Sequence, residues 1–187
     1  MAHVASIGAG MFSDLSVSTS LVPATKNQTS LDGVFATGTF ERIENVREFP
    51  AMGTPPNIVN VPVYGSSTSQ QIQGQADAPS MEITMNYVAT DWADGTSLGS
   101  MVGDGSQRVF RFALLNTEPP GYESGGGVSG LAGDTSDGTA TENSYYYWVG
   151  KVEALQVNPQ LTDSNTATVT ITVQSDFFGA FTVDPTA

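Results

Sequence analysis

The chain has 187 residues and a formal net charge of −13, from 6 Lys and Arg against 19 Asp and Glu. This excess of acid excludes the usual route to nucleic-acid binding, in which basic side chains displace the counterions of phosphate groups. The chain has no cysteine and a single histidine, His3, which excludes disulfides and thiolate chemistry and removes the commonest general base and metal ligand. Charged residues make up only 13 %, and together with the abundant Thr, Ser, Gly and Val this favours an all-β protein, either covered by other subunits or secreted.

The first half of the chain begins with weakly patterned residues, which we expect to form an N-terminal arm over 1–33 with a short edge strand. Residues 38–49 are predicted to be extended, with a bulge near Glu44 and Asn45. The spacing of three between their apolar residues leaves a short amphipathic helix open. This stretch is the most charged in the chain, so an extended conformation would give it an acidic face.

The next stretch, residues 50–79, holds five of the ten prolines. Its apolar run over 58–64 contains Pro62, which argues for an edge strand or a hairpin carried by a loop. Residues 70–75 carry no charge. A long connection of this kind is usually functional or intermolecular, so we predict a hairpin that packs on a neighbour.

Three elements are predicted between residues 80 and 116. Residues 80–87 alternate between apolar and polar side chains, as in a half-buried strand whose outer side carries Glu82, Thr84 and Asn86. Residues 96–102 are predicted to form a short helix that packs against the sheet. Residues 108–116 form a second alternating strand.

The last third begins with a Gly-rich loop over 117–143, which cannot build a core. Asp134 and Asp137 lack the further ligands of a calcium loop. Residues 144–157 are predicted to be a strand whose aromatic cluster, 145–148, either stacks on sugar rings or forms core. Residues 166–173 form a further strand, and the phenylalanines of a C-terminal arm over 176–187 are expected to dock.

The chain offers no catalytic constellation. Serines are plentiful, but no nucleophile-elbow pattern occurs and His3 is the only imidazole. A carboxylate pair such as Glu41 with Glu82 exists only if the fold brings the two together. We therefore expect no enzyme activity, no catalytic residue, no cofactor and no metal. There is no signal-peptide pattern and no apolar run of membrane-spanning length, so we expect no membrane insertion.

Taken in order, these features resemble the major tail tube proteins of long-tailed bacteriophages of the non-contractile, siphovirus type. The resemblance covers most of residues 34–175. It rests on the charged strand ending at Phe49-Pro50, the 58–64 run, the strand at 81–87, the aromatic strand at 108–114, the strand at 147–152 and the closing strand at 166–173. It implies a β-sandwich or partial barrel with one short flanking helix, whose sheets join into a ring-wide inner β-barrel on oligomerisation. The tail-tube domain would span 34–175, with 50–79 as a stacking loop.

The resemblance also implies a function. Hexameric rings would stack into a hollow tube that holds the tape measure protein and conducts DNA, without binding it specifically, during ejection. Tail terminator and distal tail proteins would be partners, and the chain would be made in the host cytoplasm and end in the virion. The candidate lumen acids are Glu41, Glu44, Glu48 and Glu82. The candidate inter-ring contacts are Ile58, Val59, Val61, Val63, Tyr64, Phe177, Phe178 and Phe181.

Two other functions remain open. A secreted carbohydrate-binding or adhesin-type β-sandwich would use the aromatic cluster at 145–148. An enzyme would need a carboxylate pair that includes Glu82.

Overall fold

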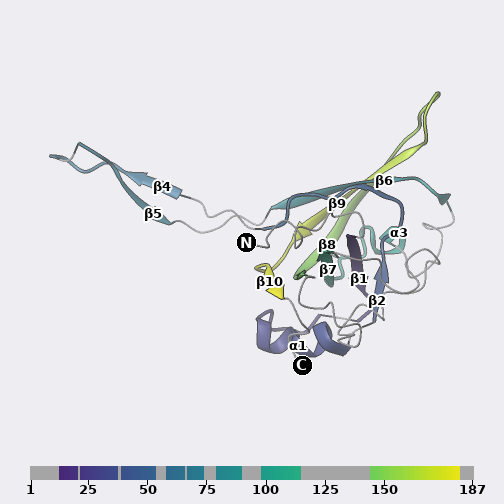
Figure 1. Ribbon diagram of the computed structural model, residues 1–187, viewed down its shortest axis with the longest axis horizontal. Coiled ribbons are helices and arrows are strands. Elements are labelled where there is room, and N and C mark those ends of the chain that lie inside the picture. The colour runs from purple at the N-terminus through teal and green to yellow at the C-terminus, as the bar shows by residue number, and fades with distance from the viewer. Residues whose placement is uncertain are drawn as a thin grey trace, which may run out of the picture.

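The computed structural model describes residues 13–20, 22–37, 39–53, 58–65, 67–73, 79–89, 98–114 and 144–181. These residues form an all-β fold with two helices (Figure 1). The strands and helices in chain order are β1 (Asp14–Ser18), α1 (Gln28–Thr37), β2 (Phe40–Arg42), β3 (Val46–Glu48), β4 (Ile58–Val61), β5 (Gln70–Gln73), β6 (Ser80–Asn86), α3 (Leu98–Met101), β7 (Arg108–Leu114), β8 (Ser144–Asn158), β9 (Thr166–Val173) and β10 (Phe178–Phe181).

The main sheet has the strand order β2-β1-β7-β8-β9-β6-β3, with β10 paired to β8. The long strand β8 belongs to both halves of it, because residues 144–150 pair with β7 and residues 150–158 pair with β9. Residues 40–48 likewise touch both ends of the sheet, since β2 pairs with β1 and β3 pairs with β6. The sheet therefore curls back on itself, as the predicted sandwich or partial barrel requires.

The predicted single strand over 38–49 is thus two short strands that lie at opposite ends of the sheet order. The break falls at Asn45, whose φ of 60° is the left-handed conformation that asparagine tolerates better than most residues. Hydrogen bonds from Ile43 N to Leu15 O and from Asn86 N to Asn45 O anchor the turn at both ends of the sheet. The bulge expected near Glu44 is in fact this turn between two edges.

Two hydrophobic clusters hold the fold together. The larger fills the space inside the curled sheet, where Ile83, Phe110, Trp148 and Ile171 meet. The smaller lies on the other side of β1, β7 and β8, where Leu31 and Phe35 of α1 cover the sheet.

The predicted alternation in β6 and β9 is confirmed, since every second side chain in each strand is buried. Of the helix predicted over 96–102, Leu98–Met101 is described, and it packs Leu98 and Met101 into the larger cluster.

The N-terminal stretch differs from its prediction. Rather than an edge strand on an arm, β1 lies between β2 and β7 and all five of its residues are buried. The ten-residue helix α1 was not predicted. Its start is nevertheless visible in the sequence, because Asn27 Oδ1 accepts a hydrogen bond from Ser30 N at 2.9 Å and Ser30 Oγ accepts one from Asn27 N at 3.3 Å. This reciprocal pair caps the helix, and Leu31 and Phe35 follow at helical spacing.

The Gly-rich loop over 117–143 and the last residues of the C-terminal arm, 182–187, lie outside the described residues. In the described part of the chain, no helix is long and apolar enough to cross a membrane.

Candidate functional site

One face of the sheet half formed by β8, β9, β6 and β3 is polar. In β6 and β9 the residues that alternate with the buried ones point away from the core, and direct register pairs bring Glu82 opposite Thr170 and Thr84 opposite Thr168. Glu48 of β3 pairs with Thr84, and Lys151 of β8 pairs with Thr172. We call this surface the polar sheet face, and it consists of Glu48, Glu82, Thr84, Asn86, Lys151, Glu153, Thr168, Thr170 and Thr172.

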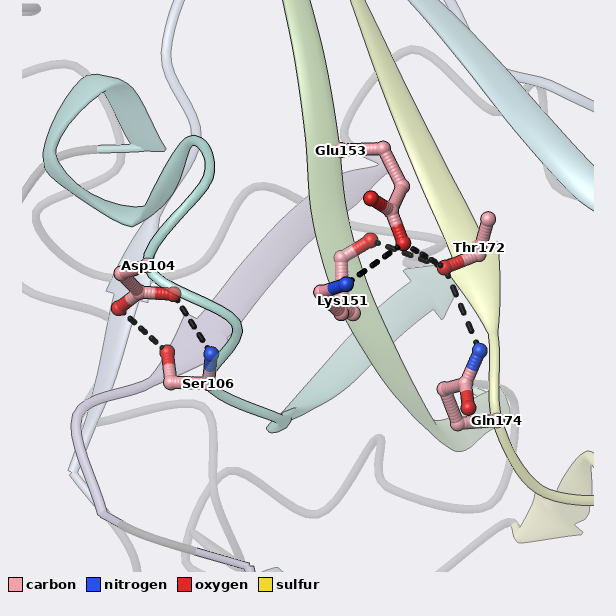
Figure 2. A network of polar contacts seen from close by, with 6 residues as sticks. All are labelled: Asp104, Ser106, Lys151, Glu153, Thr172 and Gln174. Carbon is pink, nitrogen blue, oxygen red and sulfur yellow. Dashed lines mark hydrogen bonds and ion pairs between the residues drawn. The ribbon is translucent and has the colours of Figure 1, made fainter.

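The charges at one end of this face are already paired. Lys151 Nζ lies 3.0 Å from Glu153 Oε1, and Thr172 Oγ1 donates to the same oxygen at 3.1 Å (Figure 2). Gln174 Nε2 in turn donates to Thr172 Oγ1 at 3.3 Å. The hydrogen bonds from Lys151 and Thr172 lower the pKa of Glu153, so the carboxylate stays ionised. Its charge is offset by Lys151, which leaves the acidity of the face to Glu48 and Glu82.

A second carboxylate lies near this network, on the loop before β7. Asp104 Oδ1 accepts a hydrogen bond from Ser106 N at 2.7 Å, and Asp104 Oδ2 accepts one from Ser106 Oγ at 2.6 Å (Figure 2). These two bonds lower the pKa of Asp104. Asp104 is therefore ionised at neutral pH and adds a negative charge near Lys151.

The structure brings two of the four predicted lumen acids together. Glu48 and Glu82 are exposed on neighbouring strands and belong to the polar sheet face. Glu44 lies in the exposed turn between β2 and β3, while Glu41 lies on β2, at the other end of the strand order and opposite Val17. A carboxylate pair for hydrolysis would need Glu41 and Glu82 on neighbouring strands. The structure places them on β2 and β6, which are not neighbours in the sheet.

The sheet half that carries the polar face has two open edges. On the β7 side of β8, pairing ends at Gly150, and no described residue pairs with residues 151–158 on that side. At the other end, β3 is the last strand of the order, with β6 as its described neighbour. Open edges present unpaired backbone groups, which other chains can extend.

The β4–β5 hairpin forms a separate two-stranded sheet and projects from the body of the molecule (Figure 1). Val59 pairs directly with Ile72, so these side chains share one face with Val61, while Asn60 and Gln71 share the other. Both valines are exposed and Ile72 is 55 % exposed. The hairpin predicted over 50–79 thus exists, and its apolar face has no cover among the described residues.

The C-terminal phenylalanines, by contrast, pack on their own chain. The ring of Phe177 lies 5.2 Å from Trp148, between centroids. Phe178 and Phe181 lie 5.8 Å and 6.4 Å from Phe35 of α1. The described contacts of this segment therefore lie within its own chain, where its partly buried rings pack against the core; their role as inter-ring contacts stays a prediction.

The aromatic cluster of β8 is also largely core. Trp148 is 0 % exposed and stacks on Phe110, with 5.7 Å between ring centroids. Tyr147 is buried and stacks on Phe35 at 4.3 Å. An indole enclosed in this way offers no face to a sugar ring, so the carbohydrate-binding alternative loses the residue on which it most depended.

A buried charge cluster on β1, β2 and β7 was not predicted. Arg42 Nε lies 2.9 Å from Asp14 Oδ1, and the buried Arg111 donates from Nε to Ser16 Oγ at 3.2 Å. The guanidinium of Arg111 also sits 4.4 Å from the centre of the Phe40 ring. Burial raises the pKa of Asp14 to about 6, against the opposing effect of the two arginines. The signal in the sequence is the alternation of polar residues at 14, 16 and 18 with Leu15 and Val17, a pattern that a strand with one solvent-facing side gives equally.

The described residues contain no group of three or more His, Asp or Glu side chains placed to hold a metal ion. What the geometry offers is instead a set of surfaces suited to contact with other chains: two open sheet edges, the polar sheet face and an apolar hairpin that no described residue covers. Such surfaces are typical of a subunit that assembles through its sheet.

This architecture is similar to that of tail tube and tube-terminator proteins. The chain is similar to the tail tube protein of SPP1, with a TM-score of 0.56 and 11 % identity over 92 % of this chain and 80 % of that one. It is also similar to the sheath/tube terminator, in the extended state, of the extracellular contractile injection system PVC, with a TM-score of 0.52 and 10 % identity over 92 % and 94 % of the two chains. No family model and no curated protein matches the sequence. The likeness therefore lies in the fold.

Proposed function

We propose that this chain is the structural subunit of a phage tail tube, of the long-tailed, siphovirus type. The likeness to the SPP1 tail tube over 92 % of the chain carries this proposal. Six copies close into a ring, and rings stack into a hollow tube that holds the tape measure protein and conducts DNA. The chain has no catalytic role in this function.

Ring closure is supported by the two open edges. The edge of β8 over residues 151–158 and the edge of β3 lie at opposite ends of one sheet half. If the first edge of each copy pairs with the second edge of its neighbour, the halves join into one continuous barrel and no edge remains open. Such a head-to-tail contact closes into a ring when the rotation between copies divides a full turn.

The lumen is then lined by the polar sheet face. Glu48 and Glu82, which make no ion pair with any described residue, repel phosphate, and the threonines of this face offer no positive charge to which phosphate could bind. Glu41 and Glu44, which lie off this face, are not included among the lumen acids. The tube binds tail terminator and distal tail proteins at its ends, and its subunits are made in the host cytoplasm before they enter the virion.

Electron microscopy and native mass spectrometry of the purified chain test the proposal. We expect hollow tubes, and rings of six copies where assembly is incomplete. A chain that stays monomeric under all conditions of salt and concentration, with no tube in any particle that contains it, would contradict the proposal.

The lumen assignment has a separate test in the variant Glu82→Lys. Because Glu82 is exposed and points away from the core, tubes should still form, but they should retain a labelled single-stranded oligonucleotide at low salt and release it as salt rises. Asp176→Lys makes the same charge change at an exposed site between β9 and β10 and is the matched control. Equal retention by the two variants would mean that Glu82 does not face the lumen.

A further inference from the structure

The apolar face of the β4–β5 hairpin needs a partner. An isolated two-stranded hairpin is marginally stable in water, and this one exposes Val59, Val61 and Ile72 on one face. No charged residue occurs between positions 58 and 73 in a chain with a net charge of −13. An uncharged element is suited to contact another copy of so acidic a chain, because it adds nothing to the repulsion between them.

A second exposed apolar site lies at the end of the β8–β9 hairpin. Leu161 is 100 % exposed and Val157 is 44 % exposed. The turn that presents them is ordered by hydrogen bonds from Gln160 N to Asn165 Oδ1 at 2.9 Å and from Tyr87 N to Asn165 O at 2.8 Å. We call residues 157–163 the β8–β9 tip. Asp163 is its only charged residue.

The two sites cannot meet within one molecule. Figure 1 shows the β4–β5 hairpin and the β8–β9 tip at opposite ends of the long axis of the view. A contact between the hairpin of one copy and the tip of the next is therefore heterologous and repeats along an assembly. Among the large hydrophobic residues that the described chain exposes outside the hairpin, Leu161 is the most exposed.

We infer that the apolar face of the β4–β5 hairpin packs on the β8–β9 tip of a copy in the adjacent ring, with Leu161 against Val59 and Ile72. This inference rests on the proposed function, since it requires stacked rings. It assigns a receiving surface to the hairpin and a direction to the stack, because hairpin and tip lie at different ends of each copy.

The cysteine-free chain permits a direct test. In the double variant Val59→Cys with Leu161→Cys, a disulfide forms only where the two positions come within about 7 Å between Cα atoms. Oxidised tubes should give a ladder on a non-reducing denaturing gel that extends beyond six chains, because the contact runs from ring to ring. The matched control is Asn60→Cys with Leu161→Cys, which places the thiol on the other face of the same hairpin and should give little ladder.

The outcomes separate this inference from the proposed function. Tubes that form normally but give no ladder would overturn the hairpin–tip contact and leave the tube function standing. A ladder that stops at six chains would place the contact within a ring and overturn it as well. If the unmodified chain forms no tube at all, both proposals fall together.

A second variant pair checks the contact without cross-linking. Leu161→Asp should leave rings intact but abolish their stacking, whereas Asn60→Asp adds the same charge on the other face of the hairpin and should stack normally. Combining Leu161→Asp with Val59→Lys should restore stacking at low salt. Normal stacking by Leu161→Asp alone would contradict the inference.

Discussion

Gly150 marks the point at which β8 passes from one half of the sheet to the other, and its replacement by alanine tests the packing there. Its register partners are Arg108 of β7 and Val173 of β9. A Cβ atom at this position would lie 2.8 Å from Ile171 Cγ2 and 3.0 Å from Phe110 Cδ2 and Cε2. Both neighbours are fully buried and Phe110 is stacked on Trp148, so neither side chain has room to withdraw.

The expected magnitude follows from two opposing effects. Overpacking a well-filled core costs about 1–3 kcal/mol, while replacing glycine by alanine in a strand recovers roughly 0.5–1 kcal/mol of backbone entropy. We expect Gly150→Ala to lower the free energy of unfolding by about 1–2 kcal/mol, measured by urea denaturation under conditions that keep the chain monomeric. The control is Gly33→Ala in α1, where a Cβ meets nothing within 4 Å; it should raise stability by up to about 1 kcal/mol.

A double-mutant cycle identifies the cause. Ile171→Leu removes the methyl group nearest to Gly150 while conserving the side-chain volume, at a cost of under about 1.5 kcal/mol on its own. In that background, Gly150→Ala should be less destabilising than in the parent. Unchanged stability of the single variant, or the same loss in both backgrounds, would refute the steric argument.

Three further predictions concern the buried charge, the core tryptophan and the helix cap. The folded pKa of Asp14, about 6, lies above its ordinary value of 3.8. The stability contributed by its protonated form is therefore fully present below pH 3.8 and is lost as pH rises through 6. In the Asp14→Asn variant, the difference in the free energy of unfolding between pH 4 and pH 7 should be smaller than in the parent by up to about 3 kcal/mol, as measured by urea denaturation at the two pH values. The same difference in variant and parent would contradict this prediction. Trp148→Phe should lower the free energy of unfolding by only about 1 kcal/mol, because the buried indole Nε1 has no hydrogen-bond partner among the described residues and no hydrogen bond is lost. Trp148→Ala should lower it by about 3–5 kcal/mol, because it leaves a cavity. Equal decreases in melting temperature for the two variants would contradict this prediction. Asn27→Ala should cost about 1 kcal/mol by removing the cap of α1, with loss of helical circular dichroism, and Asn27→Ser should retain most of the stability.

The sequence by itself determined the elements whose side chains follow a local period. The strands over 80–86 and 166–173 and the short helix at 98–101 could be predicted, because burial on one face of an element imposes its own repeat. The strand over 108–114 was also predicted, from the alternation of its phenylalanines, although the fold buries residues 109–113 on both faces. The uncharged hairpin with its apolar side was likewise visible. These patterns, together with the order of the elements, were sufficient to indicate the fold.

Tertiary structure alone decided where those elements lie and which side chains meet. It placed β1 inside the sheet, with Asp14 beside Arg42 and Arg111, and it split residues 40–48 between the two ends of the sheet. It enclosed Trp148 in the core, packed the partly buried C-terminal phenylalanines against it, and separated Glu41 from Glu82. The physical reason is that a strand's alternation tells which residues share a face, but pairing between distant segments tells whether that face meets solvent, core or another chain.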